Sequence, residues 1–147
     1  MGDLTKNFSK SEFACLHCKR TFIDQKLVEA LQKIRDVVGR SVYILSAYRC
    51  ATHNAKIGGA KNSMHLAGRA ADIQVDQLDT KQLLDLVLTM PEFTGIGFYV
   101  EEHFIHVDTR PGPRVTWSRI LRDGKYSSLD EGIKQWDSLK TKTKTRL

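Results

Sequence analysis

Three residues whose side chains bind metal ions lie on two short segments in the middle of the chain. His65 and Asp72 belong to residues 63–72, Ser-Met-His-Leu-Ala-Gly-Arg-Ala-Ala-Asp, and His106 belongs to residues 104–108, Phe-Ile-His-Val-Asp. Two neutral imidazoles and one carboxylate hold zinc with a coordination position left open for water, whose pKa falls to about 7 in such sites. These residue types therefore predict a hydrolytic metal site.

The residue pattern around these ligands indicates strands rather than a helix. Gly68 disfavours a helix between the first two ligands, and residues 71–76 alternate apolar and polar side chains as a half-buried strand does. Residues 104–108 alternate as well, which puts Asp108 on the same strand face as His106. We therefore expect Asp108 to accept a hydrogen bond from a ring nitrogen or to face the substrate.

The order of these residues resembles that of a known enzyme family. The pattern Ser63-x-His65-x-x-Gly68-x-Ala70-x-Asp72, with a later His106, is similar to the zinc D-alanyl-D-alanine carboxypeptidase and L-alanyl-D-glutamate endopeptidase family, whose fold is shared with the Hedgehog signalling domain. Further similar segments occur in the same order: Glu12-Phe-Ala-Cys-x-x-Cys18, Ser46-Ala-Tyr-Arg49-Cys, Asn54 through Gly58-Gly59-Ala60, and Gly95-Ile-Gly-Phe-Tyr99. The resemblance covers most of the chain.

The resemblance implies a zinc-dependent peptidase, either a carboxypeptidase or an endopeptidase, that cuts the stem or cross-link peptides of bacterial peptidoglycan. One catalytic zinc ion would be bound by His65, Asp72 and His106. Arg49 would face the substrate carbonyl or carboxylate, where a guanidinium stabilises a developing oxyanion.

Three further residues are expected on the substrate side of this zinc. The resemblance implies that Ser63 and Asn54 orient the peptide or the loop that holds it, and Asp108 would hold a group that faces the substrate.

The general base is where this chain departs from the family pattern. Family members carry Glu or Asp three residues before the last His, and this chain has His103 there. An imidazole with a pKa of about 6.5 is able to take the proton from a water molecule, and a short hairpin turn would bring His103 close to the metal. Strand parity favours Glu102 instead, and Glu101 and Asp108 are further candidates. We expect His103 first, Glu102 second and Asp108 third.

Two alternatives to a peptidase remain open. The atypical base is compatible with a catalytically silent, zinc-bound domain that binds the cell wall or has a structural role on the same fold. Two His and one carboxylate also form the iron(II) oxygenase triad, but that family has its second His downstream, and no His follows His106.

Cys15, Cys18 and Cys50 allow three interpretations. They form one disulfide with one free thiol, bind a second, structural metal, or remain reduced and pack as small hydrophobic groups. Three thiols lack a clear fourth ligand, although His17 and His53 lie close in the sequence. Of the three, we expect reduced thiols rather than a second metal.

Length and composition are typical of one globular domain. The chain has 147 residues, of which 41% are hydrophobic and 27% charged, enough for one core. We expect a single zinc peptidase domain over residues 1–138 and a basic, flexible tail over residues 139–147. The net charge of +6 favours adsorption to an anionic wall, whereas the scattered Lys and Arg argue against specific nucleic-acid binding. A monomer is expected.

The sequence has no apolar run of signal-peptide or membrane-span length. For an enzyme that cuts the wall, this indicates a phage or prophage endolysin that waits in the host bacterial cytoplasm until another protein breaches the membrane.

Hydrophobic periodicity predicts an α+β fold with a small, mainly antiparallel sheet and helices packed on one of its faces. Expected helices span residues 9–12, 24–38, 80–90 and 129–139, with Thr80 as the cap of the third. Expected strands span residues 42–48, the segment around Asp72, 96–100 and 104–108.

Overall fold

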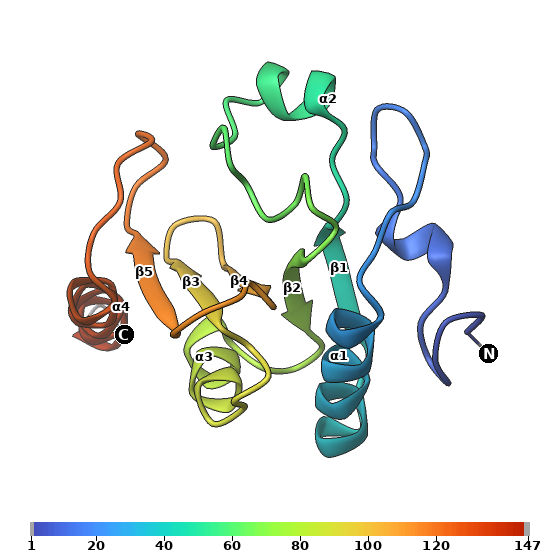
Figure 1. Cartoon of the computed structure of the whole chain (residues 1–147). Helices are drawn as coiled ribbons and strands as arrows, with labels where there is room; N and C mark the ends of the chain where they lie inside the picture. Colours follow the sequence, from blue (N-terminus) through green and yellow to red (C-terminus); the bar gives the residue numbers. More distant parts are fainter. Residues whose placement is uncertain (1, 146–147) are drawn as a thin grey trace.

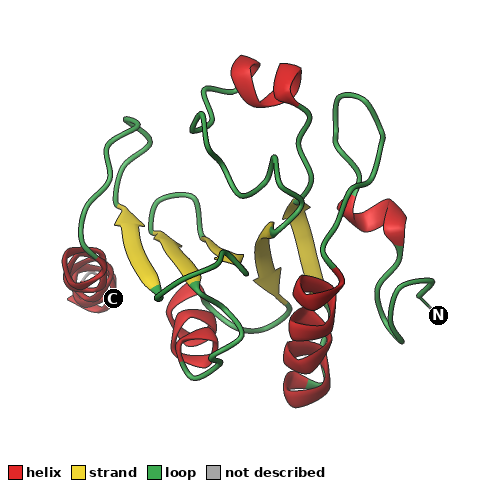
Figure 2. Ribbon diagram, viewed as in Figure 1, coloured by secondary structure: helices red, strands yellow, loops and turns green. Residues whose placement is uncertain are grey.

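The computed structural model describes residues 2–145 of the chain, which form an α+β fold (Figures 1 and 2). In chain order the elements are η1 (Lys10–Phe13), α1 (Gln25–Val38), β1 (Val42–Ser46), α2 (Ala51–Lys56), β2 (Ala70–Val75), α3 (Thr80–Leu88), β3 (Gly95–Tyr99), β4 (Phe104–Asp108), β5 (Val115–Arg119) and α4 (Leu129–Thr145), where η1 is a 3₁₀ helix. The expected fold class is confirmed.

The five strands form one sheet in the order β1-β2-β4-β3-β5. Three neighbouring pairs are antiparallel, and β3 pairs with β5 in parallel. The sheet is therefore mainly antiparallel, as expected, but β5 is a strand that the sequence pattern did not predict. Val115 and Trp117 alternate with Thr116 and Ser118, but the only buried residue of the strand is the polar Ser118.

The strand register aligns five residues in one row across the sheet. Ser46 on β1 pairs with Asp72 on β2, and Asp72 pairs with His106 on β4. His106 pairs in turn with Gly97 on β3, which pairs with Trp117 on β5. Paired residues share a sheet face, so this row places polar and aromatic side chains from four strands on one face, with glycine on β3.

The opposite face of the sheet forms the hydrophobic core. Ile73, Phe98 and Ile105 alternate with the row residues and are fully buried. Helices α1 and α3 lie together on one side of the sheet (Figures 1 and 2) and contribute buried apolar residues to this core. Trp136 of α4 packs on Phe98, with 5.7 Å between the ring centroids. The packed helices leave the row of polar residues on the other face.

Helix ends are set by specific caps. The Asp24 side chain accepts a hydrogen bond from the backbone of Lys26 at the start of α1, and Gly39 ends that helix with a left-handed φ of 64°. At α3 the expected cap, Thr80, is instead the first helical residue. Asp79 is the cap, because its carboxylate accepts from the backbone of Gln82, whose side chain accepts in return from the backbone of Asp79.

Helix α4 is longer than the sequence pattern predicted. It continues past Leu139 to Thr145, so residues 139–145 of the expected basic tail are helical, and residues 146 and 147 lie outside the described part of the chain. Within residues 2–145, every helix falls short of the length and apolar character that a membrane span requires.

Replacing Ile105 with Ala is expected to lower the free energy of unfolding by about 2–5 kcal/mol, because the fully buried side chain leaves a cavity between β4 and the helices. Denaturant unfolding measures this change. Val37→Ala is the matched control, since Val37 on α1 is 70% exposed, and its effect should stay within about 0.5 kcal/mol. Equal effects of the two substitutions would contradict this core assignment.

Candidate metal centre

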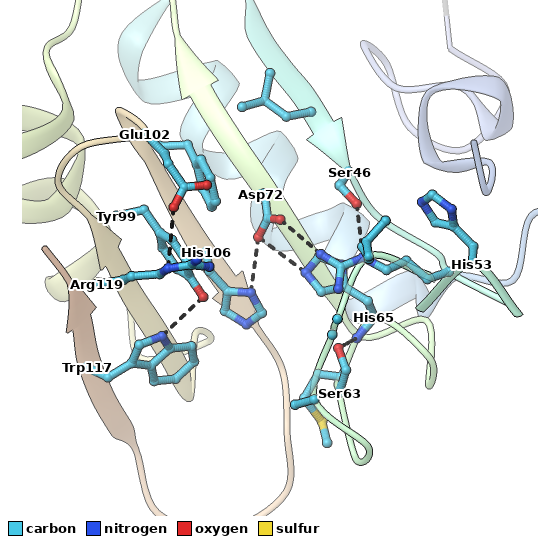
Figure 3. A pocket seen from close by; sticks show the side chains of 18 of the residues that line it. Ser46, His53, Ser63, His65, Asp72, Tyr99, Glu102, His106, Trp117 and Arg119 are labelled. Atoms are coloured by element: carbon cyan, nitrogen blue, oxygen red, sulfur yellow. Dashed lines mark hydrogen bonds and ion pairs between the residues drawn. The ribbon is translucent and has the colours of Figure 1, made fainter. Parts of the chain in front are cut away.

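The sequence-predicted ligands His65, Asp72 and His106 lie together on the polar face of the sheet. Asp72 and His106 are register partners on β2 and β4, and His65 comes from the turn that precedes β2. One ligand atom from each residue lies within 4.8 Å of the others, and all three side chains are buried. Figure 3 shows both imidazoles pointing toward the Asp72 carboxylate.

Backbone hydrogen bonds fix the turn that carries His65. The His65 carbonyl accepts from the backbone N–H of Arg49 at 3.1 Å, and the Gly68 carbonyl accepts from that of Asp24 at 2.8 Å. Gly68 has a φ of 69°, and a Cβ there would collide with the backbone of Phe22. Position 68 therefore requires glycine. The two hydrogen bonds hold the turn that carries His65 against the residues that follow β1 and those that precede α1.

The protons on the two imidazoles are assigned by their outer partners. Nδ1 of His65 lies 2.7 Å from the Ala47 carbonyl oxygen, which only accepts, and Nε2 of His106 lies 2.7 Å from Oδ2 of Asp108. The inner nitrogens lie 3.2 and 3.1 Å from the same atom, Oδ1 of Asp72. In the neutral imidazoles these nitrogens carry lone pairs, so three electron-rich atoms converge on one point.

This donor set fits zinc. Neighbouring ligand atoms around a tetrahedral zinc ion lie about 3.3 Å apart for bond lengths of about 2.0–2.1 Å, close to the separations between Asp72 and the two imidazoles. A cation among the three atoms removes the repulsion between their lone pairs. His65, Asp72 and His106 therefore have the chemistry and the spacing of a three-ligand site.

The charges around the centre favour an ionised Asp72. Burial opposes the charged form, but the neighbouring His65 and His106 outweigh it and hold the pKa of Asp72 well below its usual value. Burial likewise acts to lower the pKa of His106, but the carboxylates of Asp108 and Asp72 outweigh it and raise that pKa. A metal ion would have to displace any proton held by His106.

Asp108 orients His106 and is itself held by Arg110. Its carboxylate is fully buried and accepts hydrogen bonds from Nε and Nη2 of Arg110 at 2.9 and 2.6 Å. Burial opposes its ionisation, but Arg110 and His106 keep the pKa of Asp108 well below its ordinary range. Asp108 does not line the cavity over the centre. Of its two expected roles, the structure shows the contact with a ring nitrogen of His106.

Two glycines of β3 make room for these groups. A Cβ at Gly95 would collide with the Asp108 carboxylate, and a Cβ at Gly97 would lie 2.6 Å from the indole of Trp117. The ring centroid of Trp117 thereby lies 5.0 Å from that of His106. The Gly-Ile-Gly segment therefore allows two neighbouring strands to place large side chains over β3.

Arg49 is positioned next to the Asp72 carboxylate. Its Nη2 lies 3.4 Å from Oδ2 of Asp72, while Nε donates to Oγ of Ser46 and Nη1 to Oδ1 of Asn54, each at 3.3 Å. Asn54 is buried and donates to the Ala60 carbonyl at 2.9 Å. Arg49 lines the cavity and Asn54 does not, so Asn54 acts on the loop and on Arg49 rather than on a ligand.

A cavity of about 750 Å³ lies over the centre. It is lined by the three ligands, by the predicted residues Arg49, Ser63 and Glu102, and by further aromatic and basic side chains. Tyr99, Trp117 and Arg119 lie beside His106 in Figure 3, and Tyr126 lines the cavity as well. Of these, Tyr99, Arg119 and Tyr126 were not predicted as site residues. The Tyr99 hydroxyl accepts from Nε1 of Trp117 at 3.4 Å, and burial raises the pKa of Tyr99.

Ser63 lies on the cavity wall, as expected, and its hydroxyl accepts from the backbone N–H of His65 at 3.2 Å. It therefore helps to hold the turn that carries the first ligand.

The turn between β3 and β4 separates the two leading candidates for the general base. His103 adopts a left-handed φ of 59°, and its ring lies beside Trp136 in a second cavity, with 5.8 Å between centroids. Glu102 lines the cavity over the metal centre, and one of its carboxylate oxygens lies 3.7 Å from Nε of Arg119. The left-handed turn thus places His103 in the second cavity and Glu102 in the cavity that the ligands line.

Comparison with known proteins agrees with this arrangement. A family model described as Peptidase M15 matches residues 3–108. The chain is 29% identical over 96 residues to the peptidoglycan L,D-endopeptidase MepK of Escherichia coli strain K12, covering 60% of this chain and 52% of the relative. It is also 29% identical over 106 residues to the probable peptidoglycan L,D-endopeptidase MepK of Haemophilus influenzae, covering 67% and 55%. The chain spans about half the length of these relatives.

Asp108→Asn is expected to weaken zinc binding by about 10- to 100-fold, because the neutral amide no longer pairs with Arg110 or stabilises the proton on Nε2 of His106. Competition with a zinc-binding dye measures the affinity. Asp85→Asn is the matched control, since the Asp85 side chain is 60% exposed on α3. If both variants bound zinc as tightly as the unchanged chain, Asp108 would have no positioning role.

Proposed function

The chain belongs to the peptidase M15 family, and we propose that it is a zinc-dependent endopeptidase that hydrolyses a peptide bond in peptidoglycan. The observation that carries this proposal is the convergence of His65, Asp72 and His106 on one point beneath a cavity. The substrate class and the endopeptidase activity are supported by the names of the MepK relatives.

Zinc bound by these three residues would polarise the scissile carbonyl and lower the pKa of a coordinated water molecule. The remaining steps depend on side chains of this chain. Arg49 lies on the cavity wall beside Oδ2 of Asp72, where its guanidinium would donate to the oxygen that gains negative charge as the carbonyl is attacked. Asn54 and Ser46 keep that guanidinium in place.

Glu102 is the general base in this proposal. Its carboxylate lies in the same cavity as the ligands, 3.7 Å from Nε of Arg119, and a carboxylate accepts a proton from water. Glu102 would take the proton from the attacking water and deliver it to the leaving amine. His103 is not assigned this role, since its ring lines the separate cavity next to α4.

The cavity walls suit an extended peptide. Its volume of about 750 Å³ lies within the range of about 300–1,000 Å³ that is usual for ligand sites. Exposed apolar side chains, Leu16, Leu45 and Ile57, line it together with the charged groups of Arg49 and Arg119. A peptide that carries free carboxylates would therefore find both apolar contacts and guanidinium groups.

Incubation of the zinc-loaded protein with purified peptidoglycan is expected to shorten cross-linked or stem peptides internally, with mass spectrometry identifying the bond that is cut. Chelation should stop the release, and added zinc should restore it. Release of single terminal residues would instead indicate a carboxypeptidase. Binding without any cleavage, on walls of several chemotypes, would favour the catalytically silent binding domain.

Glu102→Gln is expected to lower kcat by about 10²- to 10⁴-fold while zinc content stays unchanged, because the amide cannot accept the proton. His103→Gln is the matched control from the same turn, and its kcat should remain close to that of the unchanged enzyme. Metal analysis of both variants separates a lost base from a lost metal. The opposite pattern, with activity lost only in His103→Gln, would exclude Glu102 as the base.

A further inference from the structure

A second group of metal-binding side chains lies outside the centre described above. Cys15, Cys18 and Cys50 come from two distant parts of the chain, yet their sulfur atoms lie within 4.8 Å of one another. Each of the three is a free thiol, with Cys15 buried and the other two half-buried. Thiolates so close together repel one another unless a proton, a disulfide or a cation intervenes.

The first two sulfurs are presented by a tight turn. The backbone N–H of Cys15 donates to the Arg20 carbonyl at 2.8 Å, and that of Lys19 donates to the Cys15 carbonyl at 2.9 Å. Lys19, directly after Cys18, has a left-handed φ of 64°. This reversal lets both cysteines of a C-x-x-C pair, a spacing typical of zinc sites, face one point.

Backbone amides surround the innermost sulfur. The N–H of Cys50 points at Sγ of Cys15 at 3.4 Å, and the amides of His17 and Cys18 also donate to it. Backbone N–H groups that donate to a sulfur stabilise its thiolate, which is the form that binds metals.

An imidazole lies next to one of the three sulfur atoms. Nδ1 of His17 is 3.6 Å from Sγ of Cys50, which matches the distance of about 3.6 Å between a sulfur and a nitrogen bound to the same tetrahedral zinc ion. The ring of His53 stacks on that of His17, with centroids 6.2 Å apart. His53 itself lines the cavity over the metal centre.

We propose that Cys15, Cys18, Cys50 and His17 bind a structural zinc ion. The site has three thiolates and one imidazole, a ligand set of closed structural zinc sites. This proposal replaces the expectation of reduced thiols, because the structure supplies the fourth ligand that the sequence left open.

The site joins the N-terminal segment to the residues around Arg49. Cys50 directly follows Arg49 and is the N-cap of α2, and the backbone of Tyr48 donates to the Phe13 carbonyl at 3.1 Å. A metal ion between these segments would restrict the backbone on which Arg49 stands. This consequence rests on the function proposed for Arg49, whereas the metal site itself does not.

Cobalt(II) binding to the full chain with His65 and His106 both replaced by Ala tests the proposal. These substitutions remove the other metal site, so one cobalt ion per chain should bind and give an intense sulfur-to-cobalt charge-transfer absorption. Adding Cys18→Ser or His17→Ala should weaken cobalt binding by at least about tenfold. Adding His53→Ala, the matched control, should leave the absorption intact. Peptidase activity is not measured in this experiment, so a negative result would contradict the structural zinc site without contradicting the proposed peptidase function.

Thiol reactivity gives a second measurement in case Cys18→Ser fails to fold. In the unchanged, zinc-loaded chain the three thiols should react slowly with a disulfide reagent, and a chelator should accelerate the reaction. The proposal is overturned if the double variant shows no thiolate absorption with cobalt, or if the zinc-loaded chain contains a disulfide. Loss of absorption in His53→Ala with retention in His17→Ala would overturn the assignment of His17.

Discussion

The buried carboxylate of Asp72 is the group on which the rest of the site depends. It accepts no proton at neutral pH, because His65 and His106 hold its pKa well below the usual value. A ring nitrogen of each imidazole lies within 3.2 Å of its Oδ1, and Nη2 of Arg49 lies 3.4 Å from its Oδ2. This one carboxylate therefore brings the two imidazoles and the guanidinium together in a buried place.

Strand register places two of the three ligands, and the turn before β2 places His65. Asp72 and His106 are opposite each other because β2 and β4 are antiparallel neighbours, and Trp117 reaches the same row because glycine at position 97 leaves space above β3. The other sheet face carries the core, whose burial under α1 and α3 fixes the strands. Each ligand is thus oriented by an outer contact, His65 by the Ala47 carbonyl and His106 by Asp108.

The sequence alone predicted those site residues whose side-chain chemistry and strand periodicity support the same interpretation. The ligands could be predicted because two imidazoles and a carboxylate flank strands of clear alternation, and the structure brings the three together. The sequence ranked His103 before Glu102 as the base, and local patterns do not reveal that His103 adopts a left-handed conformation with its ring in the second cavity. Strand β5 was missed, and His17 was named without being placed, for a related reason: both depend on contacts between distant segments, which local patterns do not encode.

The residues that line the cavity come from two parts of the chain, because β5 pairs with β3 at the edge of the sheet. The three ligands and Arg49 lie within residues 3–108, the part of the chain that the family model matches, whereas Trp117, Arg119 and Tyr126 come after it. The wall contributed by β5 and the loop beyond it is attached at the sheet edge and supplies no metal ligand. This edge of the sheet therefore sets the shape and charge of one cavity wall without contributing to the metal centre.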